Sequence, residues 1–305
     1  MDRVVVLTGE KSLMLTRRSF VQYAATATAW CQQPSGKALR LGVIAHGPDA
    51  DAAIARVGRL NFSNCQVYLD RTDATAAGSL RQALDKYRIE ATSLIVTGPG
   101  PEVYDFISGP ATIGLVPREY RAGRVARMKQ GSDFARRAGI PGVQGHCGFI
   151  PENPNDPLFG EVVQALKEVA AYCKQNSQTF RCETGQETPV TLLRAIRAAG
   201  LDNIGVNFDA ANLILYGKGN PVDALDILGP YVLGVHAKDG LYPTDPSQLG
   251  EEVPIGEGKV DFPRFIQHLK EVGYRGPITI EREISGPRQD EDIRASKAYL
   301  EKLIG

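Results

Sequence analysis

The stretch that decides the predicted fold is YVLGVHAKDG at residues 231–240, followed by IGEGKVDFPRF at 255–265 and GPITIERE at 276–283. Two short apolar runs within it, VLGVHA and PITIE, each end in a side chain that binds metal ions well, His236 and Glu281. Parallel strands of a barrel place the residues at their carboxyl ends on one rim. We therefore expect two neighbouring strands here, with His236 and Glu281 close together on that rim.

Apolar runs alternate with amphipathic stretches over the rest of the chain, and helix starts and stops such as Pro48-Asp49, Pro189, Gly200 and Pro221 separate them. The strands are mostly apolar along their length rather than alternating, which is typical of buried parallel strands. We expect eight strands, at residues 39–45, 65–70, 91–98, 141–148, 178–184, 203–209, 231–237 and 276–281. Eight strand–helix units predict a single α/β domain, a (β/α)8 TIM barrel over residues 38–305.

A doubly wound open sheet is the structural alternative to the barrel. Such a sheet usually carries a glycine-rich nucleotide-binding turn after an early strand. The segment VIAHGPDA, which follows the first expected strand, contains no GxGxxG pattern. The barrel is therefore the preferred prediction.

The composition narrows the classes of partner. The 305 residues include 35 Lys and Arg and 35 Asp and Glu, so the chain has no net charge, which argues against binding to nucleic acid or to anionic membranes. No run of 18 apolar residues is present, so no membrane span is expected. The five cysteines are far apart and form no CxxC pair, which indicates neither a disulfide framework nor a zinc ribbon.

Residues 1–37 are expected to be a leader outside the barrel. The segment TRRSFV at 16–21, followed by a small and apolar stretch, resembles a twin-arginine export signal. Met14 suits the start of such a signal better than Met1 does. We expect export to the periplasm or beyond; a disordered basic leader on a cytoplasmic protein is the alternative.

Four successive expected strands, the fifth to the eighth, each end in a side chain that can bind a metal ion: Glu183, Asp209, His236 and Glu281. A single such residue is more often a solvated rim residue, but the series of four indicates a metal site. Three carboxylates and one imidazole favour one divalent cation with hard character. We expect manganese, with magnesium, cobalt or zinc as alternatives.

Five segments resemble a known family: FRCETGQETP, VNFDAANLILYG, LGVHAKDG, IGEGKVDF and GYRGPITIERE. They are similar to the xylose isomerase-like barrel superfamily, in its sugar phosphate isomerase/epimerase branch, and the resemblance covers about residues 39–303. It implies that Glu183, Asp209, His236 and Glu281 hold one divalent metal ion. It also implies that Glu183 and Glu281 flank a sugar and exchange a proton at the carbon next to a carbonyl.

This chemistry has a clear physical basis. A C–H bond beside a carbonyl is too weak an acid to lose its proton unaided, and a metal ion stabilises the enediolate that forms. One carboxylate removes the proton from one face, and in an epimerisation the other returns it on the opposite face. The sequence thus predicts a metal-dependent sugar or keto-sugar isomerase or epimerase.

One departure from the family pattern concerns position 212. The family often has Asp-x-x-His after the sixth strand, whereas this chain has Asp209-Ala-Ala-Asn212. Asn212 can hydrogen-bond a sugar hydroxyl but cannot shuttle a proton. The apurinic-site endonucleases resemble this fold but need a histidine-rich three-zinc cluster, and this chain has only four histidines. We therefore predict no nuclease activity and no nucleic-acid partner.

The expected substrate-binding residues are His46, His146, Asn212 and Lys238. His46 and His146 follow the first and fourth strands toward the same rim, and Lys238 shares a strand face with His236. Phe106 and Phe149 on rim loops are expected to form an apolar wall over a sugar face.

Four further residues compete with these candidates. Glu187 and Glu283 are carboxylates near the expected ligands, and the family resemblance favours Glu281 over Glu283. Arg282 is expected to point away from Glu281 into a structural ion pair. His268 is expected on a helix outside the barrel.

Other functions use the same site. A metal-dependent lyase or hydrolase of oxidised (3-keto) glycosides would start with the same proton abstraction and then eliminate the aglycone. A non-catalytic sugar-binding barrel is the third alternative. The expected partner is a small carbohydrate; no basic cluster singles out a phosphate, and a homo-oligomer stays possible.

Overall fold

The structure of the protein is a computed structural model that describes residues 5–6, 13–14, 38–69 and 73–305. Two short strands near the amino terminus, β1 (Val5–Val6) and β2 (Leu13–Met14), pair with each other in antiparallel fashion. The predicted export signal around Arg17 and Arg18 lies outside the described residues.

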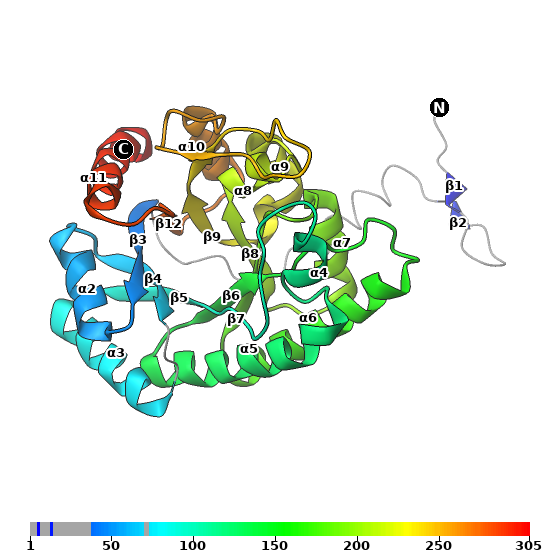
Figure 1. Cartoon of the computed structure of the whole chain (residues 1–305), viewed down its shortest axis with the longest axis horizontal. Coiled ribbons are helices and arrows are strands. Elements are labelled where there is room, and N and C mark those ends of the chain that lie inside the picture. The colour runs from blue at the N-terminus through cyan, green and yellow to red at the C-terminus, as the bar shows by residue number, and fades with distance from the viewer. Residues whose placement is uncertain (1–4, 7–12, 15–37, 70–72) are drawn as a thin grey trace.

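Eight parallel strands close into a barrel, which confirms the predicted (β/α)8 fold (Figure 1). The third strand ends earlier than predicted, at residue 95 rather than 98, because Gly98 and Pro99 follow and proline cannot donate to a strand ladder. The strands lie in the barrel in chain order, with the last one beside the first: β3 (Arg40–Gly47), β4 (Asn64–Leu69), β5 (Glu90–Ile95), β6 (Gly142–His146), β7 (Thr179–Glu183), β8 (Ile204–Asp209), β9 (Val232–Ala237) and β12 (Pro277–Ile280).

Helices alternate with the strands and cover the outside of the barrel (Figure 1). Their starts and ends follow the capping residues of the sequence: Asp49 accepts a hydrogen bond from the Ala52 N–H at 2.7 Å, and Gly200 ends a helix with φ of 70°. The outer helices are α2 (Ala50–Arg59), α3 (Ala74–Tyr87), α5 (Arg118–Ala138), α6 (Pro157–Gln175), α7 (Pro189–Ala199), α9 (Pro221–Leu228), α10 (Phe262–Glu271) and α11 (Pro287–Ile304).

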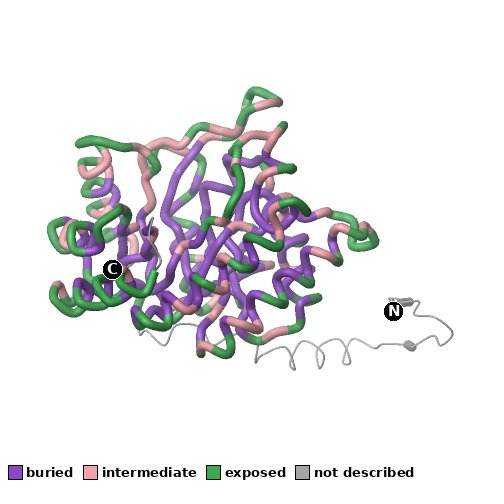
Figure 2. Tube along the Cα trace, turned by 60° about the horizontal axis from the view of Figure 1, so that its bottom comes forward, coloured by how far each residue is buried: buried purple, intermediate pink, exposed green. Residues whose placement is uncertain are grey.

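The apolar core lies between the strands and the outer helices. Outward-facing residues such as Val43, Val67 and Leu94 are buried against helices, and Figure 2 shows the buried strands surrounded by helices whose outer sides are exposed. The inside of the barrel differs from the prediction of strands that are mostly apolar along their length. Its inward-facing positions carry buried amides and a hydroxyl that hydrogen-bond to one another: Gln66, Ser93, Gln144 and Asn207.

The loop after β9 is organised around the Asp239 carboxylate, which accepts hydrogen bonds from four backbone N–H groups between residues 240 and 260. Gly258 is one of these donors, and a Cβ at this position would stand 2.1 Å from Asp239 Oδ1. The IGEGKVDF segment therefore frames the rim. Further short elements were not predicted: α4 (Gly109–Thr112), α8 (Ala210–Leu215), η1 (Gly229–Tyr231), β10 (Asp239–Gly240) and β11 (Glu252–Val253).

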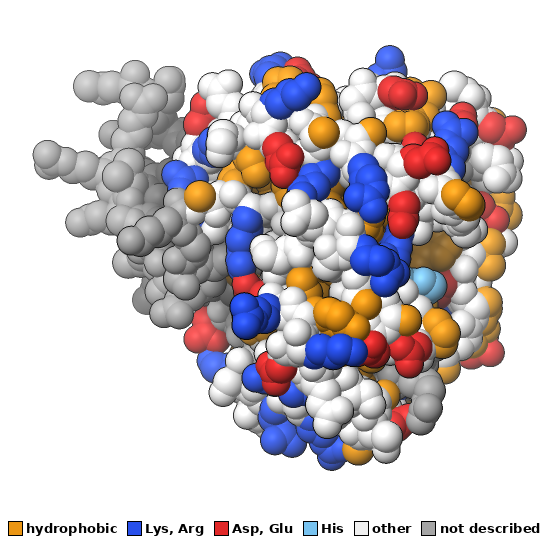
Figure 3. Space-filling view, turned by 90° about the vertical axis from the view of Figure 1, so that its left-hand side faces the viewer, with side chains coloured by type: hydrophobic (Ala, Val, Ile, Leu, Met, Phe, Trp, Pro, Cys, Tyr) orange, Lys and Arg blue, Asp and Glu red, His pale blue; other side chains and the backbone are white. Residues whose placement is uncertain are grey.

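Among the described residues, no helix has both the length and the apolar character that crossing a membrane requires. On the face shown in Figure 3, acidic and basic side chains are interspersed and no large area of one sign appears. This arrangement agrees with the absence of net charge in the sequence.

Candidate metal centre

The four predicted ligands come together at the carboxyl ends of their strands. Glu183 ends β7, Asp209 ends β8, His236 lies near the end of β9, and Glu281 directly follows β12. One ligand atom from each lies within 4.8 Å of the others. The barrel register explains this, since Asp209 is the direct cross-strand partner of His236.

The Nδ1 atom of His236 faces all three carboxylates. It lies 3.1 Å from Glu183 Oε1, 3.2 Å from Glu281 Oε2 and 3.6 Å from Asp209 Oδ2, and it forms no hydrogen bond within the described part of the chain. Carboxylate oxygens that surround a fully buried nitrogen repel its lone pair unless a positive charge lies between the oxygens and the nitrogen. Three oxygen donors and one imidazole nitrogen are a set that fits a divalent cation.

The charges of the site shift the pKa values of its carboxyl groups. Burial raises the pKa of Glu281, but His236 and Lys238 outweigh burial and hold its pKa well below the ordinary value. Burial also opposes ionisation of Glu183, yet the nearby His236 brings its pKa below the usual value. Without a cation the positive charge that keeps both glutamates ionised is on the His236 ring, whose pKa these carboxylates raise well above its ordinary value; a cation bound at Nδ1 would take the place of that proton.

Burial raises the pKa of Asp209 in spite of the nearby Lys238. Its two oxygens have different partners: Oδ1 accepts the Asn212 N–H at 2.9 Å and so caps α8, while Oδ2 faces His236. The backbone of Asp209 is held by Thr184, whose hydroxyl both donates to its carbonyl and accepts from its N–H. These contacts fix the β7 and β8 ends relative to each other.

Lys238, predicted to contact substrate, is buried among the carboxylates of the site and is not one of the residues that line the cavity. Its Nζ is 2.9 Å from Glu281 Oε2, 3.0 Å from Glu283 Oε1 and 3.1 Å from Asp209 Oδ2, and its side chain is buried. Burial lowers the pKa of Lys238, but these carboxylates raise it well above the ordinary value. The ammonium therefore stays charged and balances part of the negative charge of the site.

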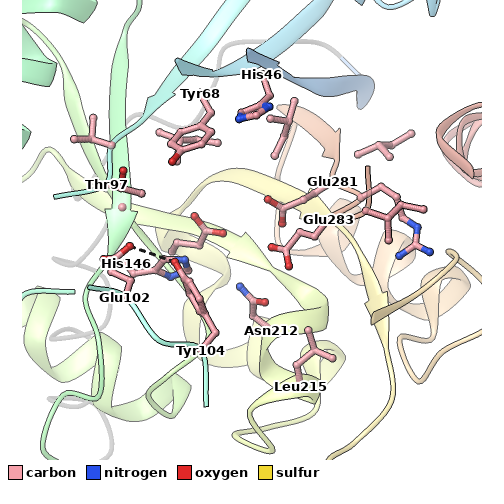
Figure 4. A pocket seen from close by; sticks show the side chains of 18 of the residues that line it. His46, Tyr68, Thr97, Glu102, Tyr104, His146, Asn212, Leu215, Glu281 and Glu283 are labelled. Atoms are coloured by element: carbon pink, nitrogen blue, oxygen red, sulfur yellow. Dashed lines mark hydrogen bonds between the residues drawn. The ribbon is translucent and has the colours of Figure 1, made fainter. Parts of the chain in front are cut away.

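A cavity of about 620 Å³ opens beside the four ligands. Three of the predicted substrate-binding residues, His46, His146 and Asn212, line it together with Glu183 and Glu281 (Figure 4). The sequence interpretation missed several other side chains of its wall: Tyr68, Glu102, Tyr104 and Tyr216.

The walls of the cavity are ordered by contacts among these side chains. The His46 ring stacks on Tyr68 with centroids 5.2 Å apart, and the two residues are direct cross-strand partners on the neighbouring strands β3 and β4. The Tyr104 hydroxyl donates to Glu102 at 3.3 Å, and its ring meets His146 edge to face at 5.9 Å. The cavity thus offers both polar groups and aromatic faces, the combination that sugar binding requires.

Two phenylalanines were predicted as an apolar wall. Phe106 and Phe149 each contact the ring of Tyr216 edge to face, with centroids 6.4 and 5.8 Å apart. Tyr216 lines the cavity, so the two phenylalanines support the wall from behind. Asn212 lies next to it, and its side-chain amide donates to the Thr184 carbonyl at 3.2 Å.

The competing candidates lie outside the ligand group. Glu187 is buried, both of its carboxylate oxygens lack a hydrogen-bond partner among the described residues, and burial raises its pKa to about 8. Glu283 contacts Lys238 rather than His236. Arg282 points away, as predicted, into ion pairs with acidic side chains at 2.8–2.9 Å. His268 lies on α10, where it pairs with Asp226 at 3.0 Å.

The sequence and the fold can now be compared with known proteins. Residues 51–303 match the sequence profile of the family described as xylose isomerase-like TIM barrel. The chain belongs to this family. A xylose isomerase domain protein from Planctomyces limnophilus is 34% identical, with a TM-score of 0.82 over 87% of this chain and 97% of the other.

Structures of lower sequence identity share the same fold. A D-tagatose 3-epimerase-like protein has a TM-score of 0.67 at 22% identity, over 87% of this chain and 96% of the other. A 3-keto-D-glucoside 4-epimerase from Escherichia coli has a TM-score of 0.64 at 14% identity, over 87% of this chain and 99% of the other. A xylose isomerase-like TIM barrel protein from Mycobacterium smegmatis in complex with magnesium has a TM-score of 0.66 at 17% identity, over 87% of this chain and 96% of the other. At these identities the likeness establishes the fold.

Among curated proteins, MJ1311 of Methanocaldococcus jannaschii is 30% identical over 171 residues. The match covers 51% of this chain and 55% of MJ1311, so the chain spans about half the length of this relative. Several proteins that share this fold are sugar epimerases by name, and the four-residue group is one that could bind a metal ion.

Proposed function

We propose that this protein is a divalent-metal-dependent epimerase or isomerase of a sugar or keto-sugar. The observation that carries the proposal is the placement of Glu183 and Glu281. Both line the cavity, and both lie within 3.2 Å of His236 Nδ1. Their strands are separated in the barrel by β8 and β9, so the two carboxylates approach the cavity from different sides.

Glu183, Asp209, His236 and Glu281 would hold the cation. When bound, the cation would supply stabilisation for the negative charge that develops on a substrate oxygen. Glu183 and Glu281 are ionised at neutral pH because their pKa values are lowered, so either can accept a proton from the carbon beside a carbonyl. Their opposed positions allow one to remove the proton and the other to return it on the opposite face.

The charges of the cavity wall support a substrate without phosphate. Three arginines line the described cavity, and each already has partners. Arg56 donates to Asp290 and to Gln289, and Arg282 is held in its two ion pairs. Arg124 donates to backbone carbonyls of residues 99, 101 and 114. Since the wall also contains four glutamates (102, 183, 281 and 283), it favours a neutral polyol over an anionic sugar.

A metal-dependent lyase or hydrolase of 3-keto glycosides is the second candidate. It would use the same proton abstraction, followed by loss of the aglycone in place of reprotonation. The size of the cavity supports this candidate, because a glycoside is larger than a free sugar. The cavity volume of about 620 Å³ exceeds the roughly 200 Å³ that a hexose fills at the packing density of organic crystals. The fold shared with a keto-glucoside epimerase points in the same direction.

Proton exchange tests the proposal directly. The protein loaded with Mn²⁺ is incubated in D₂O with ketoses and with 3-keto glycosides, and the products are examined by NMR and mass spectrometry. We expect deuterium at a carbon next to the carbonyl, and no incorporation with Glu183→Gln or Glu281→Gln. Glu168→Gln makes the same chemical change on the outer helix α6 and should leave the exchange intact.

The outcomes separate the candidates. Exchange with recovery of an epimer or isomer supports the first function, whereas release of the aglycone supports the second. Binding of a sugar without exchange under any metal condition would indicate a non-catalytic barrel. Exchange that persists in both glutamate variants would overturn the proposed roles of Glu183 and Glu281.

A further inference from the structure

A chain of polar side chains fills the inside of the barrel beneath the metal centre. Gln66 and Asn207 are fully buried, and Gln66 Nε2 donates to Asn207 Oδ1 at 2.9 Å. Ser93 and Gln144 are also fully buried, and the Ser93 hydroxyl donates to Gln144 Oε1 at 2.5 Å. Bulky aliphatic side chains usually fill this place in a barrel of eight strands. Buried amides are costly unless they are bonded, so their presence here calls for a function.

Two of the three amides of this chain, Gln66 and Gln144, reach the ring of His236 on the side away from the carboxylates. Gln66 Oε1 lies 2.6 Å from His236 Nε2, and Gln144 Nε2 lies 3.4 Å from the same atom. A nitrogen and an oxygen at 2.6 Å must share a proton, because two lone pairs at that distance repel strongly. The 3.4 Å contact is at the limit of a hydrogen bond. The Gln66 contact therefore decides that the proton is on Nε2.

The orientation of the Gln66 amide is itself fixed from the other side. Asn207 Oδ1 accepts from Gln66 Nε2, which leaves Gln66 Oε1 directed at His236. Asn207 Oδ1 and the Arg181 guanidinium lie beside Gly234, at 2.5 and 3.2 Å from where a Cβ of that glycine would stand. A guanidinium favours a carbonyl oxygen over an amide NH₂ as its neighbour. The His236 ring thus donates to Gln66, and Gln66 donates to Asn207, so the two hydrogen bonds run in one direction.

The strand backbones are irregular at these two positions. The pairing of β4 with β5 shifts register between Cys65 and Gln66, and the pairing of β8 with β9 shifts between Val206 and Asn207. Bulges of this kind redirect a side chain and are frequent next to active sites. Gln66 and Asn207, whose amides bond to each other, thus each directly follow a shift in strand register.

We propose that Gln66 is a positioning residue of the metal centre, which keeps the proton of His236 on Nε2 and presents the Nδ1 lone pair to the cation. A carbonyl partner on the far ring nitrogen of a ligand histidine fixes the tautomer and the ring orientation. The inference rests on the metal site of the proposed function and is independent of which sugar is bound. Gln144 has no such role, since its amide nitrogen is a donor and lies farther away.

Metal affinity tests this role without an activity assay. Binding of MnCl₂ to the metal-free protein is measured by titration calorimetry for the wild type, Gln66→Met, Gln66→Glu and the control Gln144→Met. We expect Gln66→Met to weaken binding about 10- to 100-fold, the range seen when such partners of ligand histidines are lost. Gln66→Glu keeps an acceptor and should retain affinity within a few-fold, and Gln144→Met should do the same. The thermal unfolding of each metal-free variant shows whether it folds.

A second measurement needs no variant. Long-range ¹H–¹⁵N spectra of the Zn²⁺-loaded wild type report which ring nitrogen of His236 carries the proton, and we expect Nε2. Wild-type affinity in Gln66→Met, or a proton on Nδ1 of the loaded wild type, overturns the role of Gln66. If the wild type binds no divalent cation, the proposed metal site fails as a whole, and this outcome is distinct from the failure of Gln66 alone.

Discussion

Lys238 Nζ lies 2.9 Å from Glu281 Oε2, so a buried ammonium contacts a carboxylate that also faces the ligand histidine. The same ammonium is 3.1 Å from Asp209 Oδ2. An ammonium in this place lowers the free energy of the ionised carboxylates. Lys238 therefore acts on the site by charge.

The first prediction is that Lys238→Met shifts the pH dependence of proton exchange. Loss of the positive charge removes one of the two main causes that hold the pKa of Glu281 low, so this pKa rises. Because the base must be ionised to accept a proton, the acidic limb of kcat/KM should move to higher pH. The measurement is the pH–rate profile of deuterium exchange.

A cation at the rim without carboxylate contacts is the matched control. Lys218 Nζ lies over the Phe149 ring, 5.7 Å from its centroid. Lys218→Met should therefore move the acidic limb much less than Lys238→Met. Equal shifts in the two variants would contradict a specific effect of the Lys238 contact.

The second prediction concerns the effect of the cation on stability. A ligand that binds only the folded state stabilises it by about 2.7 kcal/mol at a concentration of 100 times its Kd. For a barrel of this size, this corresponds to a rise in Tm of roughly 5–10 °C. EDTA should remove the increase, and differential scanning calorimetry checks it.

Asp209→Asn is the variant that should abolish this metal-dependent increase, because it removes the charge of the Oδ2 donor while the shape is kept. Asp223→Asn, at the start of α9 and outside the ligand group, should retain it. An undiminished increase with Asp209→Asn would show that the cation binds elsewhere.

The grouping of the four candidate ligands could be predicted from the sequence because it depends on strand ends alone. Parallel strands in chain order bring their last residues to one rim, and Glu183, Asp209, His236 and Glu281 all occupy that position. No knowledge of loops was needed. Lys238 was expected on the same strand face as His236. Its carboxylate partners could not be predicted, because they depend on how deeply the side chain is buried.

The polar interior was missed although the sequence contained a signal. Asn64, Gln66 and Tyr68 occupy alternate positions of β4, and this alternation indicates a polar inner face. Mostly apolar character was assumed for every strand, which concealed it. Two tyrosines of the cavity wall were missed for another reason: Tyr104 lies on a long loop and Tyr216 follows α8, and the positions of such side chains depend on tertiary contacts.

The third prediction concerns the loop held by Asp239. In Gly258→Ala the new Cβ would stand 2.1 Å from Asp239 Oδ1, and the carboxylate cannot move without losing its backbone hydrogen bonds. We expect a loss of about 1–3 kcal/mol in the free energy of unfolding. Gly160→Ala is the control: nothing lies within 4 Å of its Cβ, and this position in α6 should gain about 0.5–1 kcal/mol. Urea unfolding of both variants measures these changes, and an unaffected Gly258→Ala would contradict the tight approach.

The fourth prediction is export through the arginine pair at residues 17 and 18. We propose that the wild type is found in the exported fraction of a host with a twin-arginine pathway. Substitution of both arginines by lysine keeps the charge but loses the guanidinium groups, and the protein should then stay in the cytoplasm. Fractionation followed by immunoblotting checks the location. An unchanged distribution would contradict the role of the pair.

The fifth prediction concerns Glu187, whose carboxyl is buried without a hydrogen-bond partner among the described residues. Burial raises its pKa from 4.5 to about 8, so between these pH values the folded protein keeps a proton that the unfolded chain has lost. Stability conferred by this group must therefore fall as the pH rises from about 5 to 8. Glu187→Gln does not titrate, and its free energy of unfolding should exceed that of the wild type by an amount that grows over this range, to a few kcal/mol at pH 8. Urea titrations of both proteins at several pH values measure the difference, and a difference that is constant with pH would show that Glu187 is solvated or paired in the folded state.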